Sequence, residues 1–157
     1  MLKGGCRYGT HRVLNPEGTL PQPANKLDNT MEIYENEILI VESEKSVLKM
    51  DSWGYNNVVA LGSNSLSTTQ AKLIMSLNPK RVTFLLDKSL PLENTKRNAE
   101  LLSTFCTMRQ LQIRYWSWID NITLSDKSAP CDDTKEEFEY ILAHEIEPIE
   151  NLKEDEI

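Results

Sequence analysis

The chain has 157 residues, of which 39% are hydrophobic and 26% charged, and its net charge is −7. This length suits one globular domain with a hydrophobic core and is too short for two comfortable ones. No apolar run approaches the roughly 20 residues that span a bilayer, and the first residues lack the apolar core of a signal peptide. We therefore expect a cytoplasmic protein with no membrane partner. The three cysteines are widely spaced, which argues against a zinc site and a disulfide framework.

The negative charge is concentrated near the C-terminus. Residues 132–157 carry eleven acidic side chains against Lys135 and Lys153, whereas residues 31–131 carry eleven of each sign. The neutral middle gives no basic footprint for nucleic-acid binding, but it does not exclude such binding. We interpret residues 148–157 as a solvated acidic tail.

Residues 1–37 are rich in glycine and proline and predict an irregular N-terminal arm. After this arm, strand-like and helix-like segments alternate. Apolar runs or period-two alternation predict strands at Ile38–Val41, Asn57–Leu61, Arg81–Leu86 and Gln112–Trp118. Helical periodicity predicts helices from Ser46 to Trp53, from Thr68 to Leu77, over Leu92–Cys106 and over Asp133–Ile146.

Two of these helices have N-terminal signals. Ser67 with Gln70 predicts a capping box, and Asp133 is predicted to cap the last helix. The alternation of strand and helix predicts an α/β fold with a mostly parallel four-stranded sheet flanked by helices, and we assign residues 38–147 to it.

Two of the predicted buried strands end in a carboxylate, Glu42 after the first and Asp87 after the third. The carboxyl ends of parallel strands lie at one edge of the sheet, which is where open α/β sheets bind ligands. If these two strands are neighbours, the carboxylates raise each other's pKa or require a cation. Hard oxygen ligands favour Mg²⁺ or Mn²⁺, which also bridge phosphate oxygens. The residues alone leave open that Glu42 is only a polar residue in a solvated loop.

Three segments resemble, in order and spacing, the Toprim domain of phage and Firmicute DNA primase-like proteins: ILIVESEKSVLKM, GYNNVVALGSNSLSTTQAKLI and VTFLLDKSLPLENTKRNAELL. The resemblance covers about residues 38–147 and implies a Rossmann-like fold. It also implies nucleotidyl transfer or phosphodiester chemistry with Mg²⁺ or Mn²⁺, as in a DNA primase. Nucleic acid (DNA or nucleotides) is the implied partner, together with a helicase or other replication proteins. In this resemblance Glu42 is the general acid/base and Asp87 a Mg²⁺ ligand.

The sequence departs from the family at two positions. Ser43 stands where the family usually has glycine, and Ser89 replaces the second Asp of an Asp-x-Asp motif. A hydroxyl is a poor substitute for a carboxylate on Mg²⁺. The remaining candidate ligands are therefore the carboxylates of Glu42, Asp87, Asp126 and Asp132. Ser89 also leaves open a second hypothesis, a non-catalytic nucleic-acid-binding or assembly module.

A second resemblance lies at the start of the chain. GTHRVLNPEGTLPQPANKLDN and EIYENEILI resemble the beginning of L-erythro-3,5-diaminohexanoate dehydrogenase over about 35 residues. The chain contains no GxGxxG, so the dinucleotide-binding signature is missing. A fragment related to that dehydrogenase is the third hypothesis. For Trp116 and Trp118, which share one face of a predicted strand, packing is favoured over base stacking.

Overall fold

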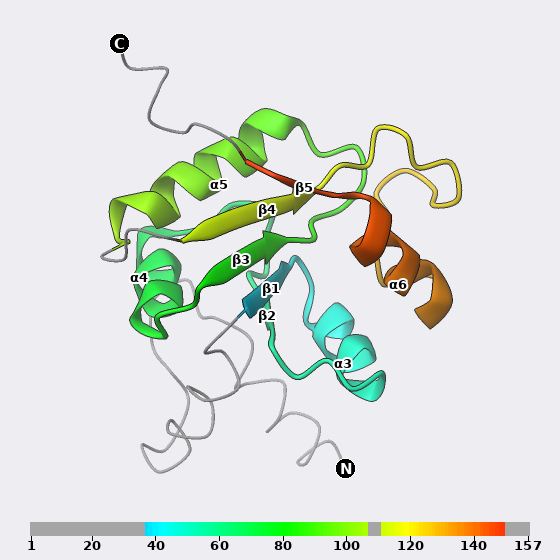
Figure 1. Cartoon of the computed structure of the whole chain (residues 1–157), viewed down its shortest axis with the longest axis horizontal. Helices are drawn as coiled ribbons and strands as arrows, with labels where there is room; N and C mark the ends of the chain where they lie inside the picture. Colours follow the sequence, from blue (N-terminus) through cyan, green and yellow to red (C-terminus); the bar gives the residue numbers. More distant parts are fainter. Residues whose placement is uncertain (1–36, 107–110, 150–157) are drawn as a thin grey trace.

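The computed structural model describes residues 37–106 and 111–149. The elements follow one another as β1 (Glu37–Val41), α3 (Glu44–Ser52), β2 (Val58–Ala60), α4 (Thr68–Ser76), β3 (Arg81–Phe84), α5 (Leu92–Thr104), β4 (Gln112–Trp116), α6 (Lys135–His144) and β5 (Ile146–Pro148) (Figure 1). The predicted N-terminal arm, apart from Glu37, and the acidic tail from residue 150 lie outside these residues.

The sheet has the strand order β2-β1-β3-β4-β5. β1 is parallel to β2 and β3, and β3 is parallel to β4, whereas β5 is antiparallel to β4. The predicted α/β class with a mostly parallel sheet is therefore confirmed. The described ranges contain five strands, one more than the four predicted.

The extra strand, β5, was predicted as the end of the last helix and the start of the tail. The error arose because Ile141, Leu142 and Ile146 keep a helical period. The helix instead ends at His144, and Ile146 pairs with Trp116 of β4. A three-residue edge strand that contains a proline gives no alternation to detect.

The N-cap prediction for this helix was also wrong by one residue. The helix begins at Lys135, and the Thr134 hydroxyl, rather than the Asp133 carboxylate, accepts the hydrogen bond from the Glu137 amide at 3.2 Å. Both residues are good caps, so the sequence did not distinguish between them. The capping box of α4 is confirmed, because the Ser67 hydroxyl accepts from the Gln70 amide and the Gln70 side chain accepts from the Ser67 amide.

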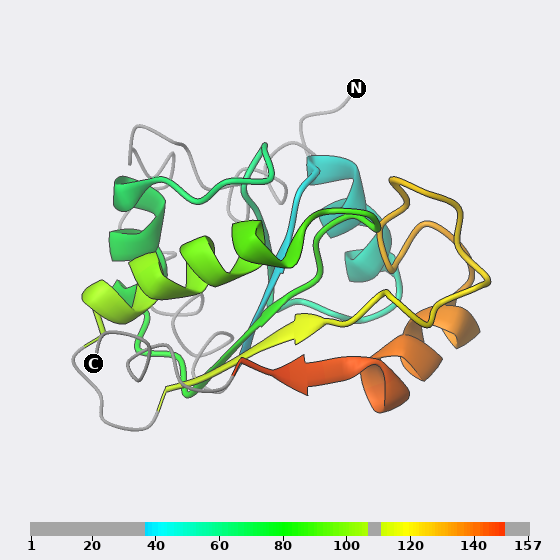
Figure 2. The same ribbon diagram turned by 90° about the horizontal axis from the view of Figure 1, so that it is seen from above.

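Helices cover both faces of the sheet, with α4 and α5 on one side and α3 and α6 on the other (Figure 2). The alternation along β1 follows from this arrangement. Ile38 and Ile40 pack in the core beneath α4 and α5, while Leu39 and Val41 pack in the core beneath α3 and α6. Because both faces of β1 are buried, its sequence is a continuous apolar run. No helix within the described ranges is long and apolar enough to cross a membrane.

Candidate functional site

The candidate site lies where β1 and β3 end. These strands are neighbours in the sheet and run parallel, with Ile40 opposite Phe84. Glu42 follows the last residue of β1, and Asp87 lies in the segment that leaves β3. Both side chains therefore extend from the same edge of the sheet, which is the edge toward which the strand arrows point in Figure 1.

The two carboxyl groups are close enough to affect each other's protonation. The pKa of Asp87 is raised from 3.8 to about 7, first by burial and then by the charge of Glu42 and a hydrogen bond with the Glu42 side chain. A smaller contribution comes from the charge of Asp132. No lysine or arginine in the described part of the chain forms an ion pair with Glu42 or Asp87. Within the described residues, the two carboxyl groups therefore have no basic side chain that compensates their negative charge.

The other two predicted ligands lie at different places. Asp132 is exposed, and its carboxylate accepts a hydrogen bond from the Ala129 amide at 2.7 Å. Its charge nevertheless reaches Asp87. Asp126 is also exposed, and it accepts a hydrogen bond from the Ser89 hydroxyl at 3.1 Å. The structure thus brings three of the four carboxylates into electrostatic contact and holds Asp126 beside Ser89.

The arrangement fits one mode of binding a hard divalent cation. No group of three histidine, cysteine or carboxylate side chains in residues 37–106 and 111–149 is gathered closely enough to hold a metal ion by itself. Mg²⁺, however, is commonly bound by one or two carboxylates, and waters and substrate phosphates complete its octahedron. Glu42 and Asp87 fit this two-carboxylate mode.

Ser43, which stands where the Toprim domains that the sequence resembles usually have glycine, takes a conformation that needs no glycine. Its φ of −106° and ψ of 149° lie in the extended region, and its hydroxyl accepts a hydrogen bond from the Ser46 amide at 3.2 Å. Ser43 is therefore the N-cap of α3. The substitution preserves the turn that presents Glu42.

Ser89 has a φ of 72°, in the left-handed region. Aspartate and asparagine adopt this region more readily than most other residues. The backbone at position 89 is thus compatible with the aspartate that the family resemblance implies there. Any carboxylate at this position would, however, face Asp126, because the Ser89 hydroxyl already bonds to it.

Lys88 is a residue whose role the sequence reasoning missed. Its ammonium group donates hydrogen bonds to the carbonyls of Asn121 and Leu124, each at 2.6 Å, and its amide donates to the carbonyl of Ser128 at 2.8 Å. These bonds join the segment that carries Asp87 to the long loop between β4 and α6. A lysine that directly follows a candidate metal ligand suggests a phosphate contact or a surface charge. The sequence therefore holds no signal of this anchoring role.

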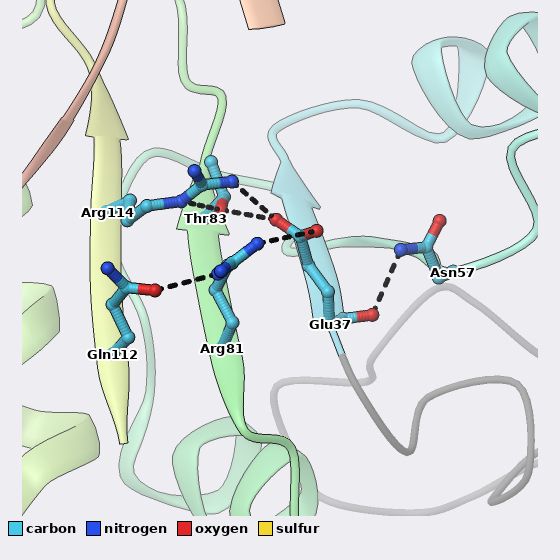
Figure 3. Close-up of polar contacts among 6 residues, drawn as sticks. All are labelled: Glu37, Asn57, Arg81, Thr83, Gln112 and Arg114. Carbon is cyan, nitrogen blue, oxygen red and sulfur yellow. Dashed lines mark hydrogen bonds and ion pairs between the residues drawn. The ribbon is translucent and has the colours of Figure 1, made fainter. Parts of the chain in front are cut away.

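A second polar cluster lies at the opposite, amino end of the strands (Figure 3). The Glu37 carboxylate accepts hydrogen bonds from Arg114 Nη2 at 2.9 Å and from the Thr83 hydroxyl at 2.8 Å, and Arg81 Nη1 lies 3.9 Å from its other oxygen. Gln112 accepts a hydrogen bond from Arg81 Nε at 2.8 Å. These bonds join β1, β3 and β4. Each charged side chain of the cluster has an opposite charge beside it, unlike Glu42 and Asp87, for which the described residues provide no basic partner.

Comparison with known proteins finds two kinds of similarity. The model of the L-erythro-3,5-diaminohexanoate dehydrogenase N-terminal domain matches residues 11–77. The dehydrogenase of Fusobacterium nucleatum is 43% identical over 72 residues, which is 46% of this chain and 20% of that enzyme. The predicted similarity at the N-terminus is confirmed, and it extends through α4, beyond the expected 35 residues.

The second similarity concerns most of the chain. The SPbeta prophage-derived protein YorJ of Bacillus subtilis is 30% identical over 160 residues, covering 92% of this chain and 40% of YorJ. Among solved structures, the E. coli primase catalytic core matches with a TM-score of 0.57 and 19% identity over 83% of this chain and 40% of that core. The described part of the chain therefore has the Toprim-like fold of primase catalytic cores. The chain spans about two fifths of the length of YorJ and of the matched primase core, and about a fifth of the length of the dehydrogenase.

Proposed function

We propose that this chain carries out Mg²⁺- or Mn²⁺-dependent nucleotidyl transfer or phosphodiester chemistry on nucleic acid in the cytoplasm, in the manner of a DNA primase. The observation that carries the proposal is the pair of neighbouring carboxyl groups, Glu42 and Asp87, at the ends of two adjacent parallel strands, with no basic partner among the described residues. The fold shared with the E. coli primase catalytic core supports it. Nucleic acid or nucleotides are the proposed partners, with a helicase or other replication proteins as proposed assembly partners.

The proposed roles follow from position and charge. Asp87 and Glu42 would bind the cation, with Asp132 adding negative charge nearby. The cation, when bound, would neutralise charge on phosphate oxygens and orient them. Glu42 would accept the proton of the attacking hydroxyl as its oxygen bonds to phosphorus and the leaving oxygen departs. Asp126 would act only through Ser89 and the loop.

The test is calorimetric titration of Mg²⁺ and Mn²⁺ into the protein and its variants. Asp87→Asn and Glu42→Gln should each weaken metal binding by roughly tenfold or more, because each removes one of two charged ligands. Glu136→Gln, which changes an exposed carboxylate on α6, is the matched control and should bind as the unaltered chain does. Unchanged affinity in both site variants would contradict the proposed site.

The second candidate function, a non-catalytic nucleic-acid-binding or assembly module, is favoured by Ser89. Ser89→Asp distinguishes the two candidates, since a gain of metal-dependent activity indicates an impaired enzyme and continued inactivity indicates a binding role. Because an aspartate at position 89 would repel Asp126, the substitution should be made with and without Asp126→Asn. The double variant removes this repulsion and gives the fairer test.

The third candidate is a fragment related to the dehydrogenase, favoured by the match over residues 11–77. Fluorescence titration with a reduced nicotinamide cofactor tests it directly. Since no GxGxxG occurs in the chain, we expect no binding at micromolar cofactor. Saturable binding would favour this candidate over the first.

A further inference from the structure

A cavity of about 120 Å³ opens beside Asp87, between the start of α5 and the carboxyl ends of β3 and β4. Leucine and aromatic side chains form most of its wall, among them Leu86, Leu90 and Trp118, and Asp87 lies at its border. The cavity is thus apolar and adjoins the carboxylate pair. The roles proposed for the metal site involve carboxylates and give no role to these apolar walls.

The aromatic walls are held in place by hydrogen bonds. The Trp118 indole N–H donates to the Leu90 carbonyl at 3.1 Å, and the Tyr115 hydroxyl donates to Glu147 at 3.1 Å. Both residues line the cavity. Because the rings are already fixed, a ligand that binds between them causes little further loss of side-chain entropy.

One polar group in the cavity lacks a partner. Thr95 lines the cavity from α5, is only 7% exposed, and its hydroxyl makes no hydrogen bond to any residue that the structure describes. A buried hydroxyl without a partner is unfavourable and uncommon in native structures. A ligand that fills the cavity and presents a hydrogen-bonding edge would satisfy it.

These features together indicate one ligand class. The apolar and aromatic walls suit a flat ring, the Thr95 hydroxyl suits a polar ring edge, and Asp87 connects the cavity to the proposed phosphate and metal site. A protein cavity of about 150 Å³ holds a single benzene ring, so about 120 Å³ suits one six-membered ring better than a fused pair. We propose that this cavity binds the pyrimidine base of a nucleotide whose phosphates reach the Glu42–Asp87 site. The proposal rests on the proposed function for the role of the phosphates, but the base site can be tested without it.

The first test uses uridine, which has no phosphate, in the absence of metal. Uridine should shift the indole N–H resonance of Trp118 in the NMR spectrum and leave that of Trp53 unchanged, because Trp53 does not line the cavity and packs against Phe138 instead. Equal effects on both indoles, or no effect on Trp118, would overturn the base site.

The second test measures affinity for uridine 5′-monophosphate and adenosine 5′-monophosphate with Mg²⁺. The pyrimidine nucleotide should bind roughly tenfold more tightly, the usual discrimination of an apolar pocket against extra atoms. Thr95→Val should weaken its binding by roughly three- to tenfold, the worth of one hydrogen bond. Thr104→Val is the matched control on the same helix and should change nothing, because Thr104 bonds to its own helix at Glu100.

The two proposals can fail separately. If uridine shifts Trp118 while Mg²⁺ affinity is independent of Glu42 and Asp87, the base site is supported and the proposed function is contradicted. If metal binding depends on both carboxylates while the two nucleotides bind equally and Thr95→Val has no effect, the base site is overturned and the proposed function stands. A short oligo(dT) compared with the free nucleotide then shows whether the base comes from a strand or from solution.

Discussion

Strand β1 has a glutamate at each end, and their surroundings are opposite. Glu37, at the amino end, has the Arg114 guanidinium at 2.9 Å and Arg81 at 3.9 Å. Glu42, at the carboxyl end, has the carboxyl group of Asp87, whose pKa it helps to raise. At the amino end basic side chains compensate the charge of Glu37, whereas no basic side chain in the described ranges forms an ion pair with Glu42 or Asp87 at the carboxyl end. The comparison teaches that the charges around a carboxylate, rather than its position at the end of a strand, decide whether it is a candidate for a functional site.

The largest expected effect on stability comes from breaking the amino-end cluster. Arg114→Met keeps the aliphatic part of the side chain but leaves Glu37 without its closest charge partner. We expect a loss of about 1.5–3 kcal/mol in the free energy of unfolding, as for hydrogen bonds between charged groups. Urea titration measures the loss.

The same variant sharpens the comparison if its metal affinity is also measured. Arg114→Met should bind Mg²⁺ as the unaltered chain does, while Asp87→Asn should lose binding without losing stability. The double variant Glu37→Gln with Arg114→Met should recover part of the stability, since the charge that then lacks a carboxylate, Arg81, is exposed to solvent. A loss of Mg²⁺ affinity in Arg114→Met would show that the two ends of the sheet are not independent.

A smaller effect is expected in the pH dependence of stability. Folded Asp87 keeps its proton up to about pH 7, whereas the unfolded chain loses it near 3.8, so the folded state binds more protons between these values. Stability should therefore fall as pH rises through this window and level off above it. The decline is moderated because solvent screens the half-buried carboxyl group.

Urea midpoints from pH 4 to 8 test this dependence. The difference between the unaltered chain and Asp87→Asn isolates the contribution of Asp87, and the variant should gain relative stability toward neutral pH. Millimolar Mg²⁺ should reduce the decline in the unaltered chain, because a bound cation compensates the ionised pair. A difference that does not vary with pH would show that Asp87 is ionised like an ordinary surface carboxylate.

The smallest expected effect concerns the turn that presents Glu42. Ser43→Ala should cost about 1 kcal/mol, because it removes the hydroxyl that caps α3, whereas Ser43→Gly should cost only a few tenths. Thermal unfolding of both variants measures the difference. Equal losses would mean that the cap contributes little and that the backbone of the turn alone positions Glu42.

The sequence predicted local features well where a short pattern defines them. The continuous apolar run of β1 and the Ser67–Gln70 pair gave a buried strand and a capping box, and both are present. Errors occurred where two local patterns were equally good, as for Asp133 and Thr134, or where an element was too short to have a period, as for β5. The anchoring role of Lys88 was missed because its partners are 33 and 36 residues away.

The sequence by itself determined that Glu42 and Asp87 follow buried strands, because burial on both faces produces a continuous apolar run within a few residues. It did not determine that β1 and β3 are neighbours, that Glu37 meets Arg114 across 77 residues, or that α5 and β4 enclose a cavity beside Asp87. Those facts depend on the order in which strands pair, and strand pairing is decided by the packing of the whole sheet against its helices. The tertiary structure therefore turned two separate carboxylates into a candidate site.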